Sequence, residues 1–403
     1  MATASPEGSR PLAELAAVFL KLGLIAFGGP AAHVGLMEQE FVRRRNWLTH
    51  EKFADLLAAT NLIPGPNSTE MAIYIGQMRA GVPGLLVAGS CFILPAVLIV
   101  TAIAWGYQQY GALPQVGGVL YGVKPVIIAV VAQALWGLAR RGVKSLLHLE
   151  VGLVAAALSF LGVNELILLV TAGGVVMGWH WLRQRGRPGG SPQKMNLFVP
   201  VLPVLPARHS LLATAATGVA AGGSAPFGLW PLFLFFLKVG AVLYGSGYVL
   251  LAFLRADLVE RWHWLSEAQL LDAIAVGQIT PGPLFTTATF VGYVLGGVPA
   301  ALLATLGIFL PAFFFVAVSG PLIPRLRNSP LAGAFLDGVV MASLALMAVV
   351  TWHLGRAALC DVTTVMLALV SGVLLLRFRL NSAWLVLGGA VFGLLASLVG
   401  IAR

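Results

Sequence analysis

The chain has 403 residues, of which 59% are hydrophobic and 10% are charged, whereas a soluble globular domain has about 25% charged residues. Together with a mean hydropathy of +0.90, this composition excludes an ordinary soluble protein and a disordered chain, and it predicts an integral membrane protein. The formal charge of +10 then indicates orientation in the lipid bilayer rather than nucleic-acid binding, because cytoplasmic loops accumulate Lys and Arg.

Apolar segments predict the membrane-spanning helices of the first half. The N-terminus lacks the basic region and cleavage site of a signal peptide, so we expect the first segment to be retained. Three segments are long enough for the ~20 residues that cross a bilayer, and two shorter ones predict a tight helical hairpin. The long segments are 15–36, 84–105 and 116–138, and the short ones are 146–162 and 165–182.

The second half of the chain repeats the first. Phe19-Leu20-Lys21-x-Gly23 recurs as Phe236-Leu237-Lys238-x-Gly240, and residues that pair at this offset are called equivalent. The self-similarity predicts two homologous domains, 1–182 and 209–403, separated by a linker, 183–208, whose five basic residues and lack of acids indicate a cytoplasmic loop. Further equivalent pairs are Arg44 and Arg261, Trp47 and Trp264, Asp55 and Asp272, and Pro64-Gly65-Pro66 and Pro281-Gly282-Pro283; after the offset shortens by one position, Leu94-Pro95 pairs with Leu310-Pro311 and Gly122 with Gly338.

Each half contains a helix pair interrupted at Pro-Gly-Pro. Thr49 and Ser266 are plausible N-caps, the latter completed by Gln269 as a capping box, and each begins a helix that runs only to the break. The helix after the first break, from about Asn67 to Arg79, spans roughly 21 Å at about 1.5 Å per residue, so it cannot cross the bilayer alone. We therefore predict a re-entrant hairpin in each half, with its tip near the midplane beside protein or a water-filled cavity.

Charge placement favours an inverted arrangement. With the hairpin counted as no crossing, the first half crosses the membrane five times, so the second half must lie upside down. With the linker inside, 17 of the 25 basic residues fall on the cytoplasmic side and 4 on the other, and the N-terminus lies outside. The predicted fold class is thus an all-α integral membrane protein with two inverted-topology repeats, about 10 transmembrane helices and two re-entrant helical hairpins.

The Pro-Gly-Pro tips predict a site for a small anion. Backbone N–H groups at the start of a half-helix point at anionic substrates in secondary transporters, and hydroxyls follow both breaks. The alternative is that Pro-Gly-Pro only kinks two packed helices, with the hydroxyls bonded back to carbonyls. The candidate residues are Pro64, Gly65, Pro66, Asn67, Ser68 and Thr69 in the first half, and Pro281, Gly282, Pro283, Thr286 and Thr287 in the second.

Two lysines occupy equivalent positions in the first span of each half. A charge within a span is costly and therefore often functional, so Lys21 and Lys238 are candidates for meeting the anion. Snorkelling of the ammonium groups to the interface is the alternative for both. Lys124 has no basic counterpart, and we rank it below them.

Three acids lie in or near the broken helices. Glu70 follows Asn67 at the spacing of a capping box, which is one interpretation, while a carrier of protons or cations is the other. Asp55 and Asp272 recur near the membrane interface, where we expect capping or a salt bridge to the Arg-rich loop rather than a role in transport.

Glycine-rich stretches interrupt the first span of each half. Gly28-Gly29-Pro30 and its copy Gly245-Ser246-Gly247 allow close backbone approach, either as a second break facing the Pro-Gly-Pro tip or as small-residue helix packing. We interpret the nearby His33 as a packed histidine. The other histidines lack metal-ligand spacing, and neither nucleotide-binding nor nucleophile motifs occur, so we expect no metal, no cofactor and no enzymatic activity.

Several of these motifs resemble one known family. Phe27-Gly28-Gly29-Pro30-Ala31-Ala32-His33, then Glu40-Phe41-Val42-x-Arg44-Arg45-x-Trp47-Leu48 and Pro64-Gly65-Pro66, resemble the N-terminal half of the chromate ion transporter (CHR) family, of the long-chain two-domain type. Gln278-x-x-Pro281-Gly282-Pro283-Leu284-Phe285 and Ile308-Phe309-Leu310-Pro311 resemble its C-terminal half. The resemblance implies a multi-pass carrier of the bacterial or archaeal inner membrane that exports chromate, a sulfate-like dianion, driven by the membrane potential or the proton gradient.

The sequence departs from this family at two places. Asn67-Ser68-Thr69-Glu70 stands where the family more often has small residues and a Gln, and the second Gly-rich motif is Tyr244-Gly245-Ser246-Gly247. Glu70 would mark a proton-coupled variant, or a subgroup with a different substrate.

We therefore expect a secondary active transporter, an antiporter of a small oxyanion such as chromate or sulfate, which binds between the two tips. The alternative is a channel or a proton-coupled carrier for a different small solute, with Glu70 as the coupling carboxylate. A non-transporting membrane scaffold or an intramembrane enzyme is the third class, and the lack of a nucleophile and base set argues against the enzyme. The sequence does not decide between import and export. It also leaves the oligomeric state open, and a homodimer is one possibility.

Overall fold

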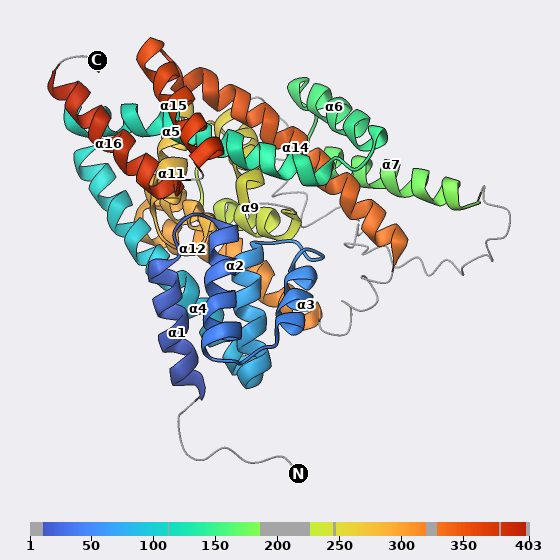
Figure 1. Ribbon diagram of the computed structural model, residues 1–403. Coiled ribbons are helices and arrows are strands. Elements are labelled where there is room, and N and C mark those ends of the chain that lie inside the picture. The colour runs from blue at the N-terminus through green and yellow to red at the C-terminus, as the bar shows by residue number, and fades with distance from the viewer. Residues whose placement is uncertain are drawn as a thin grey trace.

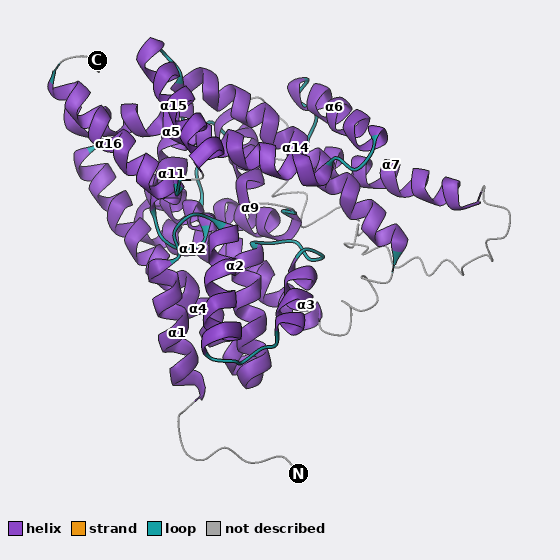
Figure 2. Cartoon of the chain, in the orientation of Figure 1, coloured by secondary structure: helices purple, strands orange, loops and turns teal. Residues whose placement is uncertain are grey.

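A computed structural model describes residues 11–111, 113–185, 226–244, 247–319, 329–378 and 380–399. Within these ranges every regular element is a helix, as Figure 2 shows, so the predicted all-α class is confirmed for them. Gly245, Ser246 and most of the linker 183–208 lie outside the described residues.

The described residues of the first half form seven α-helices and one π-helical segment, and Figure 1 labels the α-helices. They are α1 (Pro11–Ile25), α2 (Pro30–Glu38), η1 (Gln39–Arg44), α3 (His50–Thr60), α4 (Asn67–Tyr110), α5 (Pro114–Gly142), α6 (Leu146–Phe160) and α7 (Glu165–Arg185). The described elements of the second half are α9 (Leu229–Val242), η3 (Gly247–Val249), α10 (Leu250–Phe253), η4 (Leu254–Arg261), α11 (Glu267–Ile279), η5 (Leu284–Thr286), α12 (Thr287–Ser319), α14 (Pro330–Ala358), α15 (Val362–Phe378) and α16 (Ser382–Leu398).

Five of the described helices are long and apolar enough to cross a membrane, namely α4, α5, α7, α12 and α14. Four shorter apolar helices, α6, α9, α15 and α16, accompany them. The segment 15–36, expected as one span, is instead two helices, because the chain leaves the helical conformation between Ile25 and Pro30. The expected number of crossings stays a prediction.

The interrupted helix pairs lie where the sequence places them. Thr49 caps α3 by accepting a hydrogen bond from the backbone N–H of Lys52, and Ser266 and Gln269 form the predicted capping box of α11. Beyond the first break, α4 is helical from Asn67 until the backbone departs from helical geometry at Ala80 and Gly81. The matching departure in α12 falls at Gly296 and Gly297. Each long helix is thus a short half-helix joined to a longer one.

The two halves interlock through their last helices. The hairpin α6–α7 of the first half packs on α14 of the second, while α15 and α16 of the second half pack on α5 of the first. Figure 1 shows both pairings in the upper part of the molecule. The largest cluster of buried apolar side chains accordingly draws on both halves, from Ile93 to Val386. Each half therefore completes its core with a hairpin from the other.

Small residues make these exchanged contacts close. Gly122 of α5 lies against the backbone of Gly389 in α16, where an added Cβ would clash with the Gly389 carbonyl oxygen. The equivalent residue Gly338 of α14 lies in the same way against Ala172 and Gly173 of α7. Helices can approach this closely in a membrane protein only where side chains are small.

We predict that Gly122→Ala lowers stability by about 1–3 kcal/mol, because the methyl group overpacks the α5–α16 crossing. Gly117→Ala is the matched control, since a Cβ there meets open space and the gain in helix propensity is up to about 1 kcal/mol. Thermal unfolding of the detergent-solubilised protein measures both. An unfolding temperature for Gly122→Ala at or above the wild-type value would contradict the close crossing.

Candidate functional site

The two Pro-Gly-Pro tips are held by reciprocal backbone hydrogen bonds. The N–H of Gly65 donates to the carbonyl of Leu243 at 2.9 Å, and the N–H of Gly282 donates to the carbonyl of Ala26 at 2.9 Å. Leu243 is the equivalent of Ala26 in the repeat, as Gly282 is of Gly65. Each tip thus satisfies a carbonyl at the end of the other half's first helix, where intrahelical partners run out.

Glycine is required at both tips. Gly65 and Gly282 have φ values of 140° and 99°, which L side chains rarely adopt. A Cβ on Gly282 would also lie 2.8 Å from the Ala96 Cβ in α4, and one on Gly65 would lie 3.6 Å from the Ala312 Cβ in α12. Since Ala96 and Ala312 are equivalent, each tip touches the same point of the opposite long helix. The break at Gly28 and Gly29 faces the tip of the other half, since both glycines line a cavity together with Gly282.

The first tip contains a buried carboxyl group. Glu70 is 0% exposed, and within the described residues neither of its carboxyl oxygens has a hydrogen-bond partner. The side chain lies directly against Gly65, and the hydroxyl of the neighbouring Thr69 is likewise unpartnered among the described atoms. The N-cap of α4 is Pro66, and Asn67 donates its side-chain amide to Asn61 at 2.7 Å. The capping interpretation of Glu70 is therefore wrong.

His33 ties the first tip to the break in the first helix. Its Nε2 lies 3.0 Å from the Ala26 carbonyl and its Nδ1 lies 3.2 Å from the Ser68 hydroxyl. Because a carbonyl only accepts, Nε2 carries the proton and Nδ1 accepts from Ser68. The Ala26 carbonyl thus receives both His33 and the N–H of Gly282. As expected, His33 is a packed histidine. Its two hydrogen bonds connect the end of the first helix to the first tip.

The second tip contains hydroxyls in place of the acid. Thr286 donates to the carbonyl of Pro283, and Thr287 donates to that of Leu284, both at 2.8 Å. These are the back-bonds to carbonyls that the alternative interpretation expects. Thr287 is the equivalent of Glu70. The two tips therefore share a backbone but differ in chemistry at the same position.

A small cavity lies where the first break meets the second tip. It has a volume of about 10 Å³, which is the order of a single water probe. A tetrahedral oxyanion is larger, so this conformation would have to open to admit one. The side chain of Gln278 interacts with the Tyr248 hydroxyl, and its amide N–H group is a hydrogen-bond donor at this place. The lining residues include Gly28, Gly29, Tyr248, Gln278, Thr280 and Gly282.

Gln278 was not among the site residues predicted from the sequence. Its equivalent in the first half is Asn61, which also lies just before its tip. An amide recurring at one position of both repeats is the signal that could have identified it. Tyr248 and Thr280 carry no such signal, since Ala31 and Ile63 stand at their equivalents.

Neither candidate lysine lines this cavity. The ammonium of Lys238 lies 2.5 Å from a carboxylate oxygen of Asp257, which is fully buried and also pairs with Arg261. Lys21 is exposed and lines a larger cavity beside η1. The equivalent lysines therefore occupy different environments.

Asp272 does not face the Arg-rich loop as expected. Lys124 of α5 lies 2.9 Å from one of its carboxylate oxygens, and the Tyr107 hydroxyl of α4 donates to the other at 2.8 Å. Asp272 is only 4% exposed, so this ion pair between the halves is largely removed from solvent. Its equivalent, Asp55, is exposed. We ranked Lys124 below Lys21 and Lys238 and therefore did not predict its ion pair with Asp272.

Comparison with known proteins gives a consistent match. The model of the chromate transporter family matches residues 13–179 and again residues 230–394, one segment in each half. The chain belongs to the chromate transporter family. It is therefore a multi-pass membrane protein of a family of transporters, not of enzymes.

Individual relatives cover most of the chain. A chromate transport protein of Cupriavidus metallidurans is 34% identical over 96% of this chain and 93% of its own length. A probable chromate transport protein of Synechococcus elongatus is 32% identical, with 89% and 88% covered, and a chromate transport protein of Pseudomonas aeruginosa is 32% identical, with 85% and 81% covered. No solved structure matches the chain.

We predict that Lys124→Met lowers the free energy of unfolding by about 3–5 kcal/mol, because it leaves the Asp272 carboxylate buried without its cation. Tyr107→Phe removes one hydrogen bond to the carboxylate and should lower it by about 1.5–3 kcal/mol. Chemical unfolding in detergent measures both. The double variant Lys124→Met/Asp272→Asn should recover much of the loss, and a double variant no more stable than Lys124→Met would argue against the pair.

Proposed function

We propose that this protein is a secondary active transporter that carries chromate, or a dianion of the same shape, across the bacterial inner membrane and out of the cytoplasm. The names of the relatives supply the substrate. The observation that carries the mechanism is the reciprocal pair of hydrogen bonds, from Gly65 to Leu243 and from Gly282 to Ala26.

The reciprocal pair supports inverted repeats. Two equivalent bonds, exchanged between equivalent residues, are what a two-fold relation between the halves produces. If each half crosses the membrane an odd number of times, the axis of this two-fold relation lies in the membrane plane, as in many secondary transporters. The basic linker then lies in the cytoplasm, and the two tips are re-entrant hairpins whose irregular backbone is satisfied by protein.

The proposed substrate site lies at the tips. The half-helix that starts at Asn67 and the helical segment that starts at Leu284 carry the partial positive charge of helix N-termini, which favours a bound anion. The amide of Gln278 adds a side-chain N–H donor that lines the cavity. Because the cavity holds about 10 Å³, the conformation is closed, and binding requires the tips and the broken first helices to separate.

Glu70 supports coupling to protons. A carboxylate without a partner in an apolar site loses its hydration without compensation, so the acid would bind a proton there. A neutral Glu70 does not repel a dianion, whereas an ionised one does. Alternation between the two forms links proton movement to anion movement. The second candidate function, a proton-coupled carrier of another small solute, rests on the same residue.

Chromate flux tests the substrate. In proteoliposomes we expect uptake of labelled chromate, inhibited by sulfate, with no nucleotide added. A hydrogen bond to a charged group contributes about 1.5–3 kcal/mol, so Gln278→Leu should lower flux at low chromate about tenfold or more. Gln115→Leu is the matched control, because Gln115 is exposed at the start of α5. Absence of both chromate and sulfate flux in folded protein would end the proposal.

A pH gradient tests the coupling. We expect flux through the wild-type protein to respond to an imposed pH gradient, while Glu70→Gln, which mimics the protonated acid, keeps flux driven by the membrane potential but loses that response. Glu51→Gln, at an exposed acid of α3, should behave as wild type. If Glu70→Gln retains the full response to the gradient, Glu70 does not couple protons. Flux of a different solute with chromate inactive would favour the second candidate.

A further inference from the structure

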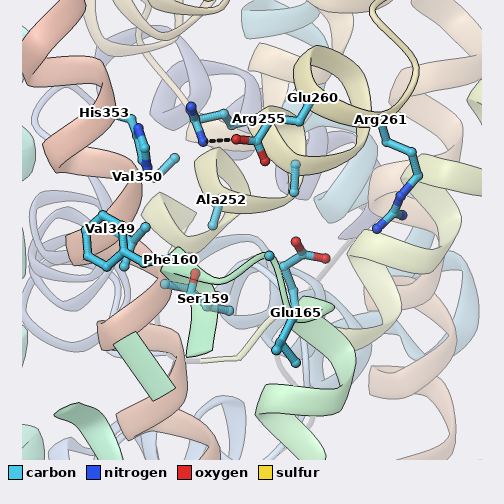
Figure 3. A pocket seen from close by; sticks show the side chains of 14 residues that line it. Ser159, Phe160, Glu165, Ala252, Arg255, Glu260, Arg261, Val349, Val350 and His353 are labelled. Carbon is cyan, nitrogen blue, oxygen red and sulfur yellow. Dashed lines mark hydrogen bonds and ion pairs between the residues drawn. The ribbon is translucent and has the colours of Figure 1, made fainter. Parts of the chain in front are cut away.

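Two cavities lie away from the tips, one beside η1 of the first half and one beside η4 of the second, and each is named after that half. The first-half cavity has a volume of about 720 Å³ and is lined by Lys21, Glu40 and Arg44, among others. The second-half cavity has a volume of about 370 Å³ and lies between η4, α14 and the turn joining α6 to α7. Figure 3 shows Arg255, Glu260 and Arg261 around it, with Glu165 and His353 on the opposing elements.

The two cavities are equivalent in the repeat. Five pairs of equivalent residues line them, one member of each pair in either cavity: Gly35 and Ala252, Glu38 and Arg255, Gln39 and Ala256, Arg43 and Glu260, and Arg44 and Arg261. An ion pair recurs with its charges exchanged, since Glu38 pairs with Arg43 at 3.4 Å and Arg255 pairs with Glu260 at 2.5 Å. Two independent surface hollows would not share five positions.

A lysine beside each cavity differs in its state. Lys238 is bound to Asp257 at 2.5 Å, and Asp257 also pairs with Arg261, which lines the smaller second-half cavity. Its equivalent Lys21 lines the larger cavity together with Glu40, the equivalent of Asp257. Within the described part of the chain, Lys21 forms no ion pair with Glu40, which is instead bound by Arg44 and Arg45 at 3.1 and 2.7 Å. The cavity is larger where the lysine is released.

Because the Glu40 side chain is negatively charged, it can form an ion pair with a lysine. Burial alone would raise the pKa of the Glu40 carboxyl, but hydrogen bonds from Arg45 and Arg44 bring the pKa below its usual value. Glu40 is thus an anion at neutral pH. Lys21, facing a cavity that Arg43 and Arg44 also line, presents its ammonium group to any anion arriving there.

We propose that the two cavities are the vestibules through which a dianionic oxyanion reaches and leaves the tips from opposite faces, and that a lysine–acid pair narrows each of them in turn. Here the second-half vestibule, with the Lys238–Asp257 pair formed, is the narrower one, and the first-half vestibule is the wider one, with Lys21 positioned to bind the anion. In the opposite state Lys21 pairs with Glu40 and Lys238 is released. This inference rests on the proposed inverted repeats.

Thiol labelling tests the vestibules without any transported ion, so its failure is distinct from a failure of chromate flux. Cys91 and Cys360 are first replaced by Ala, and single cysteines are placed at Gly35 and at Ala252, where each faces its cavity. A Cβ at Gly35 meets no neighbour, so that variant should fold. In oriented membrane vesicles, an impermeant reagent should label Gly35→Cys from one face and Ala252→Cys from the other. Labelling of both from the same face would overturn the proposal.

Labelling rates test the lysine switch. Lys238→Met should speed labelling at Ala252→Cys and slow it at Gly35→Cys by about fivefold, a typical lower value for coupling between states. Arg261 still compensates Asp257 in this variant. Lys21→Met should shift both rates the opposite way, and Lys238→Arg should behave as wild type. If Lys21→Met changes neither rate, Arg45 simply replaces the lysine in the first half, and the switch is wrong.

Discussion

The centre of the molecule depends on two backbone hydrogen bonds, each made by the glycine of a Pro-Gly-Pro tip to a carbonyl that ends the other half's first helix. A helix broken within a bilayer exposes polar groups that lipid cannot satisfy, so their partners must come from protein. Here each break takes one of its partners from the tip of the other half. The contacts of Gly65 with Ala312 and of Gly282 with Ala96, and the hairpins exchanged onto α5 and α14, are then parts of one mutual arrangement.

Equivalent backbones in the two tips carry unlike side chains, and this difference gives each tip its own chemistry. Position 70 holds a buried acid without a partner among the described residues, whereas position 287 holds a hydroxyl satisfied by its own helix. Ser68 is bonded to His33, but its equivalent is Phe285. Under the proposed function, the first tip would exchange a proton, while the second brings a neutral backbone and the amide of Gln278 to the same region. Unlike tips on a repeated backbone would then separate coupling from anion recognition.

The sequence predicted the repeats, the caps of α3 and α11 and the broken helices, because local spacing and self-similarity record them directly. It did not predict which half supplies each partner. Asp272 has the spacing of a residue near the start of a surface helix, yet α5 of the other half covers it with Lys124. Glu70 has capping spacing, but Pro66 occupies the N-cap and the acid turns toward Gly65. The spacing of residues along one helix does not indicate which residue of the other repeat packs against it.

The exchange of partners also restricts how the halves can move. If transport proceeds by rocking of two bodies, the sequence halves cannot be those bodies without breaking both tip bonds and two glycine-lined helix crossings, which pack too closely to slide freely. Bodies that combine α5 with α15 and α16, and α14 with α6 and α7, keep the crossings intact. The tips and the broken first helices are then the parts left to separate, and these surround the small cavity at the proposed substrate site.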